Sequence, residues 1–108
     1  MTDTPGTLSI ALSSEGGRGT VLLSGELDVY TSGDLRDRLA QAIDEGAKHL
    51  VIDLADLDFI DSTGLGVLVG ALKRARQAGG DIELRSPNPA TRKVFEITGL
   101  MRVFTISE

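Results

Sequence analysis

Two adjacent hydroxyl side chains follow an aspartate near the middle of the chain, in the stretch Asp61-Ser62-Thr63-Gly64. The stretch joins an apolar run to a long segment with helical spacing, so we expect it at a strand-to-helix turn. Asp61 can cap that helix, and both hydroxyls then lie in its first turn, where backbone N–H groups lack intrahelical partners. A phosphoryl group added there would meet a favourable field. The stretch therefore favours covalent modification of a hydroxyl.

Catalytic uses of the same stretch have weaker support. An aspartic protease needs Asp, then Ser or Thr, then Gly, and here one residue too many separates Asp61 from Gly64. A dinucleotide fingerprint needs Gly-x-Gly-x-x-Gly, but Gly64 and Gly66 are followed by Gly70, one residue too late. A serine nucleophile needs a nearby base, and the only histidine, His49, heads a strand without a partner motif. We expect no enzymatic activity and keep nucleotide binding at these glycines as an alternative.

Composition narrows the class of protein further. A chain of 108 residues with 41% hydrophobic content predicts one domain over residues 1–108, with residues 1–6 as a frayed terminus. A formal net charge of −5 without a cluster of Lys and Arg argues against nucleic acids and membranes as partners. Cysteine is absent, which excludes disulfides and thiolate metal sites. We expect a cytoplasmic protein that uses no metal or other cofactor.

The elements that position the turn follow from the spacing of apolar residues. Strands are predicted over residues 8–12, 20–24, 49–54, 81–85 and 103–106. Helices are predicted from residue 31 or 32 to Gly46, over residues 62–78, and from the Pro-rich stretch 86–89 to Gly99. The order β-β-α-β-α-β-α-β predicts a single α/β domain with a mixed, largely parallel sheet packed against helices.

Some side chains receive specific predictions. Phe59 and Ile60 should anchor the turn in the core, and Val94, Phe95 and Ile97 should pack from the last helix. Gly25-Glu26-Leu27-Asp28 should leave the second strand and enter a turn.

Two glycines inside the long helix, Gly66 and Gly70, need an explanation of their own. A glycine within a helix costs about 1 kcal/mol relative to alanine. Either the helix packs closely on the sheet at these positions, or another molecule approaches it closely there.

Four stretches together resemble the STAS domain of bacterial anti-sigma factor antagonists: Gly25–Asp28, the apolar strand 50–54, Phe59–Gly66 and Val94–Leu100. The resemblance implies that the serine after the motif aspartate, Ser62, is phosphorylated by a partner that is both anti-sigma factor and serine kinase. It also implies that only the unphosphorylated protein binds this partner and frees a sigma factor, and that a metal-dependent serine/threonine phosphatase removes the mark.

The same resemblance implies which residues meet the partner and in what state the protein exists. The expected partner-binding residues are Glu26, Asp28, Asp61, Ser62, Thr63, Gly64 and Gly66. The family implies a monomer when free. Some of its members instead serve as scaffolds in stress-signalling complexes, which together with nucleotide binding is the alternative function. The choice of Ser62 over Thr63 comes from the resemblance and not from the physics of the turn.

Overall fold

An antiparallel hairpin opens the part of the chain that the computed structural model describes, residues 7–108. It consists of β1 (Leu8–Glu15) and β2 (Arg18–Leu27). Gly16 and Gly17 form its turn with φ angles of 60° and 82°, which side chains disfavour and glycine adopts freely. The predicted frayed terminus, residues 1–6, lies outside the described residues.

Three further strands run parallel to β2 and complete a sheet of order β1-β2-β3-β4-β5. They are β3 (His49–Ile60), β4 (Asp81–Arg85) and β5 (Thr105–Ser107). The connections between successive parallel strands contain α1 (Ser32–Asp44), α2 (Ser62–Gln77), and α3 (Pro89–Thr98) with the 3₁₀ helix η1 (Leu100–Arg102). The predicted fold class and order of elements are therefore confirmed.

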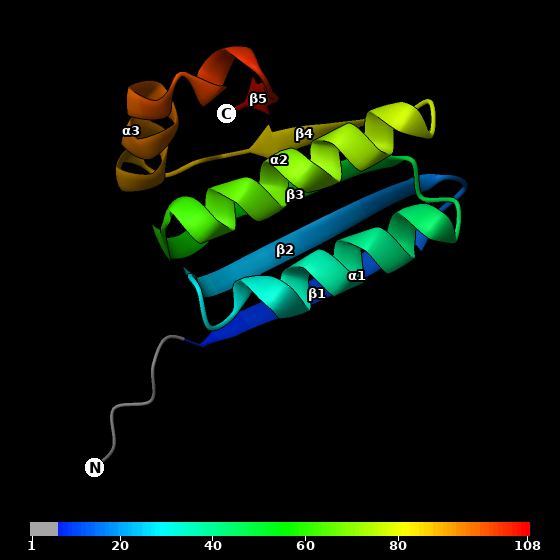
Figure 1. Cartoon of the computed structure of the whole chain (residues 1–108), viewed down its shortest axis with the longest axis horizontal. Coiled ribbons are helices and arrows are strands. Elements are labelled where there is room, and N and C mark those ends of the chain that lie inside the picture. Colours follow the sequence, from blue (N-terminus) through cyan, green and yellow to red (C-terminus); the bar gives the residue numbers. More distant parts are fainter. Residues whose placement is uncertain (1–6) are drawn as a thin grey trace.

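Helices α1 and α2 lie side by side over one face of the sheet (Figure 1). That face carries the alternating apolar residues of the strands, and Val21, Leu27 and Ile52 on it are completely buried. On the opposite face the intervening residues of β2 are exposed or half-buried. The core thus lies between the helices and the sheet. No helix within residues 7–108 is long and apolar enough to cross a membrane.

Strand boundaries differ from the predicted ones: β1, β2 and β3 are all longer than predicted, and the last strand is shifted. Gly25–Leu27 belongs to β2 and not to a turn, because β3 continues to Ile60 and pairs with it through two shifts in register. The last strand is Thr105–Ser107, and not 103–106, since Phe104 is buried against Phe95 with ring centroids 6.1 Å apart. The extension of β2 and the shift of the last strand come from contacts between segments that are not neighbours in sequence.

The second half of β3 is supported by α3. Since β4 pairs only with His49–Asp53, the later carbonyl groups of β3 need other donors. Asn88 Nδ2 donates to the carbonyl of Leu57 at 2.6 Å, and Thr91 Oγ1 donates to it at 3.4 Å. Asn88 Oδ1 also caps α3 by accepting from the N–H of Thr91 at 2.9 Å. These bonds hold the end of β3 from which the Asp61 turn leaves the sheet.

The packing of α3 departs from prediction at one residue. Phe95 is completely buried and Val94 is half-buried, as predicted, but Ile97 is 75% exposed. Ile97 therefore lies on the solvent face of the helix.

Candidate functional site

The candidate site is built where β2 and β3 end side by side. Leu27 pairs with Ile60, so Asp28 and Asp61 leave the sheet as neighbours. Both aliphatic residues are buried, which confirms the prediction that Ile60 anchors the turn. The N–H of Asp61 donates to the carbonyl of Leu27 at 3.1 Å and extends the strand pairing by one bond.

Asp61 caps α2, as predicted, and also reaches across to the neighbouring turn. Its Oδ1 accepts from the N–H of Gly64 at 2.9 Å, while its backbone is extended. Its Oδ2 accepts from the N–H of Val29 at 3.1 Å. One carboxylate therefore joins the β3–α2 junction to the β2–α1 junction.

Asp28 builds the turn between β2 and α1. Its Oδ1 accepts from the N–H groups of Tyr30 and Thr31 at 2.9 and 3.1 Å. Thr31 Oγ1 accepts from the N–H of Asp28 at 2.9 Å and donates to the carbonyl of Glu26 at 2.9 Å. Thr31 stands at the N-cap position of α1, but its side chain bonds to the turn and does not cap the helix. The structure thus gives Asp28 a structural role in shaping the loop.

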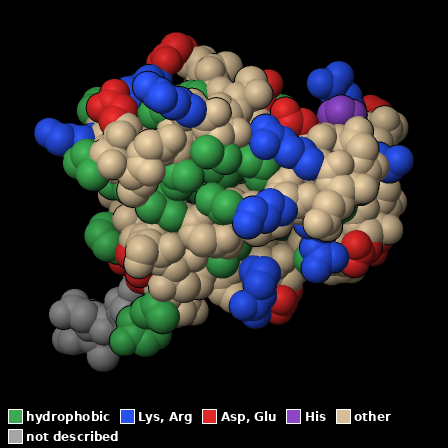
Figure 2. All heavy atoms as spheres, turned by 45° about the horizontal axis from the view of Figure 1, so that its top comes forward, with side chains coloured by type: hydrophobic (Ala, Val, Ile, Leu, Met, Phe, Trp, Pro, Cys, Tyr) green, Lys and Arg blue, Asp and Glu red, His purple; other side chains and the backbone are tan. Residues whose placement is uncertain are grey.

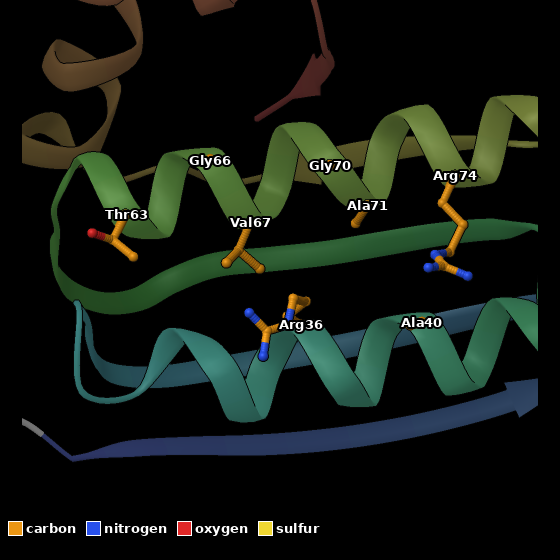
Figure 3. Close-up of a pocket in the computed structure, with 8 residues that line it drawn as sticks. All are labelled: Arg36, Ala40, Thr63, Gly66, Val67, Gly70, Ala71 and Arg74. Atoms are coloured by element: carbon orange, nitrogen blue, oxygen red, sulfur yellow. The ribbon is translucent and has the colours of Figure 1, made fainter.

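Ser62 and Thr63 both lie exposed in the first turn of α2. The helix itself supplies no acceptor for their N–H groups. Their side chains differ in placement: Thr63 points toward α1 and lines the groove between the two helices, as Figure 3 shows. Ser62 is not among the residues that line the groove. The two hydroxyls are therefore presented to different surroundings.

Exposed apolar side chains flank the turn on two sides. Val29 is 60% exposed and Tyr30 is 76% exposed, in the loop that Asp61 holds. Phe59 is 49% exposed, so the prediction that it packs into the core is wrong. After the shifts in strand register, Leu57 and Ile60 are the buried residues and the two between them face outward.

Val29 and Tyr30 are site residues that the sequence reasoning missed. A signal was present in the sequence, because two large apolar residues stand together between the polar turn residues Asp28 and Thr31. Neither side chain is needed for the turn, whose hydrogen bonds come from the backbone and from those two polar residues.

Charge is distributed unevenly around the site. The acidic residues nearest the turn in sequence are Asp61 and the exposed Asp58. A third acidic residue, the half-buried Glu26, lies on the adjacent strand, where it pairs with Phe59. Figure 2 shows hydrophobic side chains over the middle and left of one face, whereas most Lys and Arg side chains lie toward the right, where α2 ends. The turn therefore lies away from Arg74 and Arg76 at the other end of α2, which pair with Asp44 and Asp81.

A groove of about 370 Å³ runs between α1 and α2, beginning beside the turn. It is lined by Arg36, Ala40, Thr63, Gly66, Val67, Gly70, Ala71 and Arg74 (Figure 3). A Cβ atom built on Gly66 or Gly70 would meet nothing within 4 Å. Close packing on the sheet therefore does not explain these two glycines.

Gly64 has a different environment from the groove glycines. It is buried, and a Cβ atom there would lie 2.6 Å from Leu27 Cγ and 3.0 Å from the carbonyl oxygen of Leu27. Gly64 therefore lets the first turn of α2 approach β2. Because it is buried, its expected role in partner binding would be to position the turn and not to contact the partner itself.

Comparisons with known proteins agree with the fold and with the predicted family. The model of the STAS domain family matches residues 9–108. The anti-sigma-B factor antagonist of Bacillus subtilis is 40% identical over 87 residues, covering 81% of this chain and 79% of the relative. The anti-sigma F factor antagonist of Paenibacillus polymyxa is 34% identical over 102 residues, covering 92% and 87% of the two chains.

Two solved structures of the antagonist SpoIIAA are also similar. The unphosphorylated form has a TM-score of 0.80 at 27% identity, with 93% of this chain and 89% of that chain covered. The phosphorylated form, from Bacillus, has a TM-score of 0.70 at 28% identity, with 93% and 92% covered. With a family model that matches residues 9–108 and relatives at 34–40% identity, this chain belongs to the STAS domain family.

Proposed function

We propose that this protein is an anti-sigma factor antagonist that is controlled by phosphorylation of Ser62. In the unphosphorylated state it binds an anti-sigma factor that has serine kinase activity, and a sigma factor is released. Phosphorylation ends this binding, and a metal-dependent serine/threonine phosphatase restores it. The names of the most similar relatives, and the two phosphorylation states of SpoIIAA, support this function.

The observation that carries the proposal is the way in which Ser62 is presented. The residue is exposed at the first position of α2, directly after a capping aspartate that is bonded to Gly64 and to Val29. A kinase needs a hydroxyl that it can reach and that stays in one geometry for transfer of the phosphoryl group. The double anchoring of Asp61 supplies that geometry without any help from a partner.

The surface around Ser62 suits protein binding. Tyrosine is among the residues that contribute most to binding energy at interfaces, and Tyr30 is largely exposed beside the turn. Val29 and Phe59 extend the apolar surface on either side. Within this docking surface, Asp28 and Asp61 would act mainly by fixing the backbone, whereas Glu26, Ser62 and Thr63 would offer polar contacts at its rim.

The groove between α1 and α2 would extend the docking surface. Gly66 and Gly70 leave open space on α2, although each costs helix stability. A partner that packs against the backbone at these two positions would explain why alanine does not occupy them. The groove begins at Thr63, so this contact would be continuous with the one at Ser62.

Phosphorylation would act on the docking surface and leave the fold in place. A phosphate at the start of a helix gains about 0.3–1 kcal/mol from the helix dipole. Reversing a two-state conformational equilibrium from 1:99 to 99:1 needs about 5.5 kcal/mol, which is far more. Close to two negative charges beside Asp58 and Asp61 in a closed interface can cost several kcal/mol through repulsion and desolvation. Repulsion in the interface is therefore the stronger effect.

Incubation with the cognate anti-sigma factor and ATP, followed by mapping of the phosphosite, tests the proposal. We expect phosphate on Ser62 in the wild type and in Thr63→Val, and none on Ser62→Ala. Phosphate found only on Thr63 or elsewhere would contradict the assignment. The Thr63 variant distinguishes the two adjacent hydroxyls, because it removes that of Thr63 and keeps Ser62, and its exposed side chain makes a folding defect unexpected.

The nucleotide-binding alternative has less support. Gly64 is packed against Leu27 and cannot form part of an open phosphate loop. The two arginines of the groove each have a carboxylate within 3.4 Å, Asp37 for Arg36 and Asp44 for Arg74. A titration with ATP or GTP that shifts the amide resonances of residues 64–70 in a saturable way would favour this alternative.

A further inference from the structure

Helix α3 carries an apolar stripe that the core of the domain does not use. Thr91 and Phe95 are the buried residues of this helix. Ala90, Val94 and Ile97 recur at intervals of four and three residues, so they lie together on a different face. Ala90 and Ile97 are exposed, and Val94 is half-buried. These three residues, which we call the α3 stripe, form an apolar surface on the outside of the molecule.

The α3 stripe leads to the Ser62 turn from one side. A hollow of about 100 Å³ between β3 and α3 is lined by Asp58, Phe59, Ile60, Ala90, Thr91 and Val94. Its β3 residues end the strand, and Ser62 follows Ile60 by two positions. Helices α1 and α3 lie on opposite sides of the start of α2 (Figure 1). Ser62 therefore lies between two surfaces, the groove on the α1 side and the α3 stripe on the other.

The α3 stripe is held rigidly relative to the end of β3. The carbonyl of Leu57 in β3 accepts from the side chains of Asn88 and Thr91 at the start of α3. Further along the helix, Phe95 packs edge-on against Phe104, with an interplanar angle of 76°. An enzyme bound to the stripe would therefore find the hydroxyl at the start of α2 in a fixed position.

A lysine borders the α3 stripe. At 3.6 residues per turn, Lys93 lies about 40° around the helix from Ile97, whereas Glu96 lies about 100° from it. Lys93 is exposed, and it takes part in none of the ion pairs found within residues 7–108. The stripe and its lysine therefore suit a partner that combines an apolar contact with negative charge.

We propose that the α3 stripe and Lys93 form the docking surface for the phosphatase that removes phosphate from Ser62. This inference rests on the proposed function, in which two enzymes act on one hydroxyl in opposite states of modification. Phosphate at Ser62 repels the first enzyme, so the second must bind through contacts that added negative charge does not weaken. An apolar stripe beside a lysine meets that condition. A metal-dependent phosphatase also carries carboxylates for its metal ions, and Lys93 would face this negative charge.

Kinetics of dephosphorylation test this docking surface. The full chain, phosphorylated on Ser62 by the cognate anti-sigma factor and ATP, is the substrate of the cognate phosphatase. Ile97→Asp and Lys93→Glu should each raise KM about tenfold and leave kcat within about twofold, because they weaken docking without touching the phosphate. Both residues are exposed, so both variants should fold normally. Their affinity for the anti-sigma factor before phosphorylation should equal that of the wild type.

Two further variants are the controls. Lys73→Glu makes the same change of charge as Lys93→Glu, at an exposed position in the second half of α2, and should leave KM unchanged. Tyr30→Ala should weaken binding of the anti-sigma factor and also leave KM unchanged.

The possible outcomes separate this inference from the proposed function. Equal KM for Ile97→Asp and wild type would overturn the inference and leave the proposed function intact. So would an equal rise of KM in Tyr30→Ala, or loss of anti-sigma factor binding in Ile97→Asp, because both enzymes would then share one surface. Phosphate absent from Ser62 after the first step would contradict the proposed function, and this inference with it.

Discussion

The two junctions that form the candidate site begin alike and continue differently. Each begins with an aspartate directly after a buried aliphatic residue, Leu27-Asp28 in one and Ile60-Asp61 in the other. In the β2–α1 junction, three residues separate the aspartate from the helix. In the β3–α2 junction, the helix starts at the next residue, Ser62.

The number of residues before the helix decides what each junction presents. The longer junction folds back on the Asp28 carboxylate and leaves Val29 and Tyr30 exposed. The shorter one places the Ser62 hydroxyl at the start of a helix. Asp61 then fixes the two relative to each other through its bond to Val29. An apolar contact surface and a modifiable hydroxyl can thus be held together by one carboxylate.

The largest loss of affinity for the anti-sigma factor is expected from a negative charge at Ser62, the hydroxyl at the end of the shorter junction. Ser62→Asp should weaken binding of the anti-sigma factor by about 3 kcal/mol or more, roughly 100-fold, because the new carboxylate lies beside Asp58 and Asp61 in the interface. Ser62→Ala should keep the affinity of the wild type. Calorimetric titration measures both, and circular dichroism should show an unchanged fold. Equal affinity of Ser62→Asp and wild type would rule out repulsion as the switch.

The contribution of the longer junction is tested at Tyr30. Tyr30→Ala should cost about 2–3 kcal/mol of binding, because it removes a large aromatic side chain from the centre of the proposed contact. Its stability should stay within about 0.5 kcal/mol of wild type, since the residue is 76% exposed. Ile97→Ala is a matched control, because Ile97 is 75% exposed on α3. If both variants bound equally well, the β2–α1 loop would not belong to the docking surface.

Removal of the Asp61 carboxylate should break the hydrogen bond that joins the two junctions. Asp61→Ala should lower the free energy of unfolding by about 2 kcal/mol, through loss of the helix cap and of the bond to Val29. Asp61→Asn should lower it by about 1 kcal/mol, since asparagine also caps helices but cannot accept from Val29 with its amide nitrogen. Urea unfolding provides the measurement, with the exposed Asp58→Ala as control.

If Asp61→Asn were as stable as wild type, the bond between the junctions would contribute nothing measurable. Exchange of the Val29 amide reports on the same bond directly. It should become faster in both Asp61 variants and stay unchanged in Asp58→Ala.

The order of elements could be predicted from the sequence because apolar spacing is a local property. The helix cap by Asp61 could be predicted for the same reason, since its acceptor and donor are three residues apart. The ends of the strands could not be predicted in this way. That Gly25–Leu27 stays in β2 depends on pairing with residues 57–60 of β3, which no local pattern reveals.

Two features of the site depend on contacts that the sequence does not display. The bond from Val29 to Asp61 spans 32 positions, so nothing near either residue indicates it. Phe59 has the apolar character of a core residue, but the altered register of β3 turns it outward. The sequence also left two explanations for Gly66, and only the space around it in the structure excludes close packing on the sheet.

The two junctions lead into helices whose first turns can be matched position by position, and the smallest expected effects are at Gly66. Counted from the helix start, Gly66 of α2 corresponds to Arg36 of α1, and Gly70 corresponds to Ala40; all four line the groove. Gly66→Ala should raise the free energy of unfolding by up to about 1 kcal/mol, because its methyl group meets no atom of the chain. The same variant should bind the anti-sigma factor more weakly than wild type.

Gly64→Ala is the control for Gly66→Ala, which should raise the free energy of unfolding and lower the affinity for the partner. Its methyl group would overlap Leu27, so the variant should lose about 1–3 kcal/mol of stability. Thermal unfolding and calorimetric titration of the two variants, side by side, separate a glycine that the fold requires from one that a partner requires. If Gly66→Ala were more stable and bound with unchanged affinity, the groove would lie outside the docking surface. The partner would then contact only the junctions themselves.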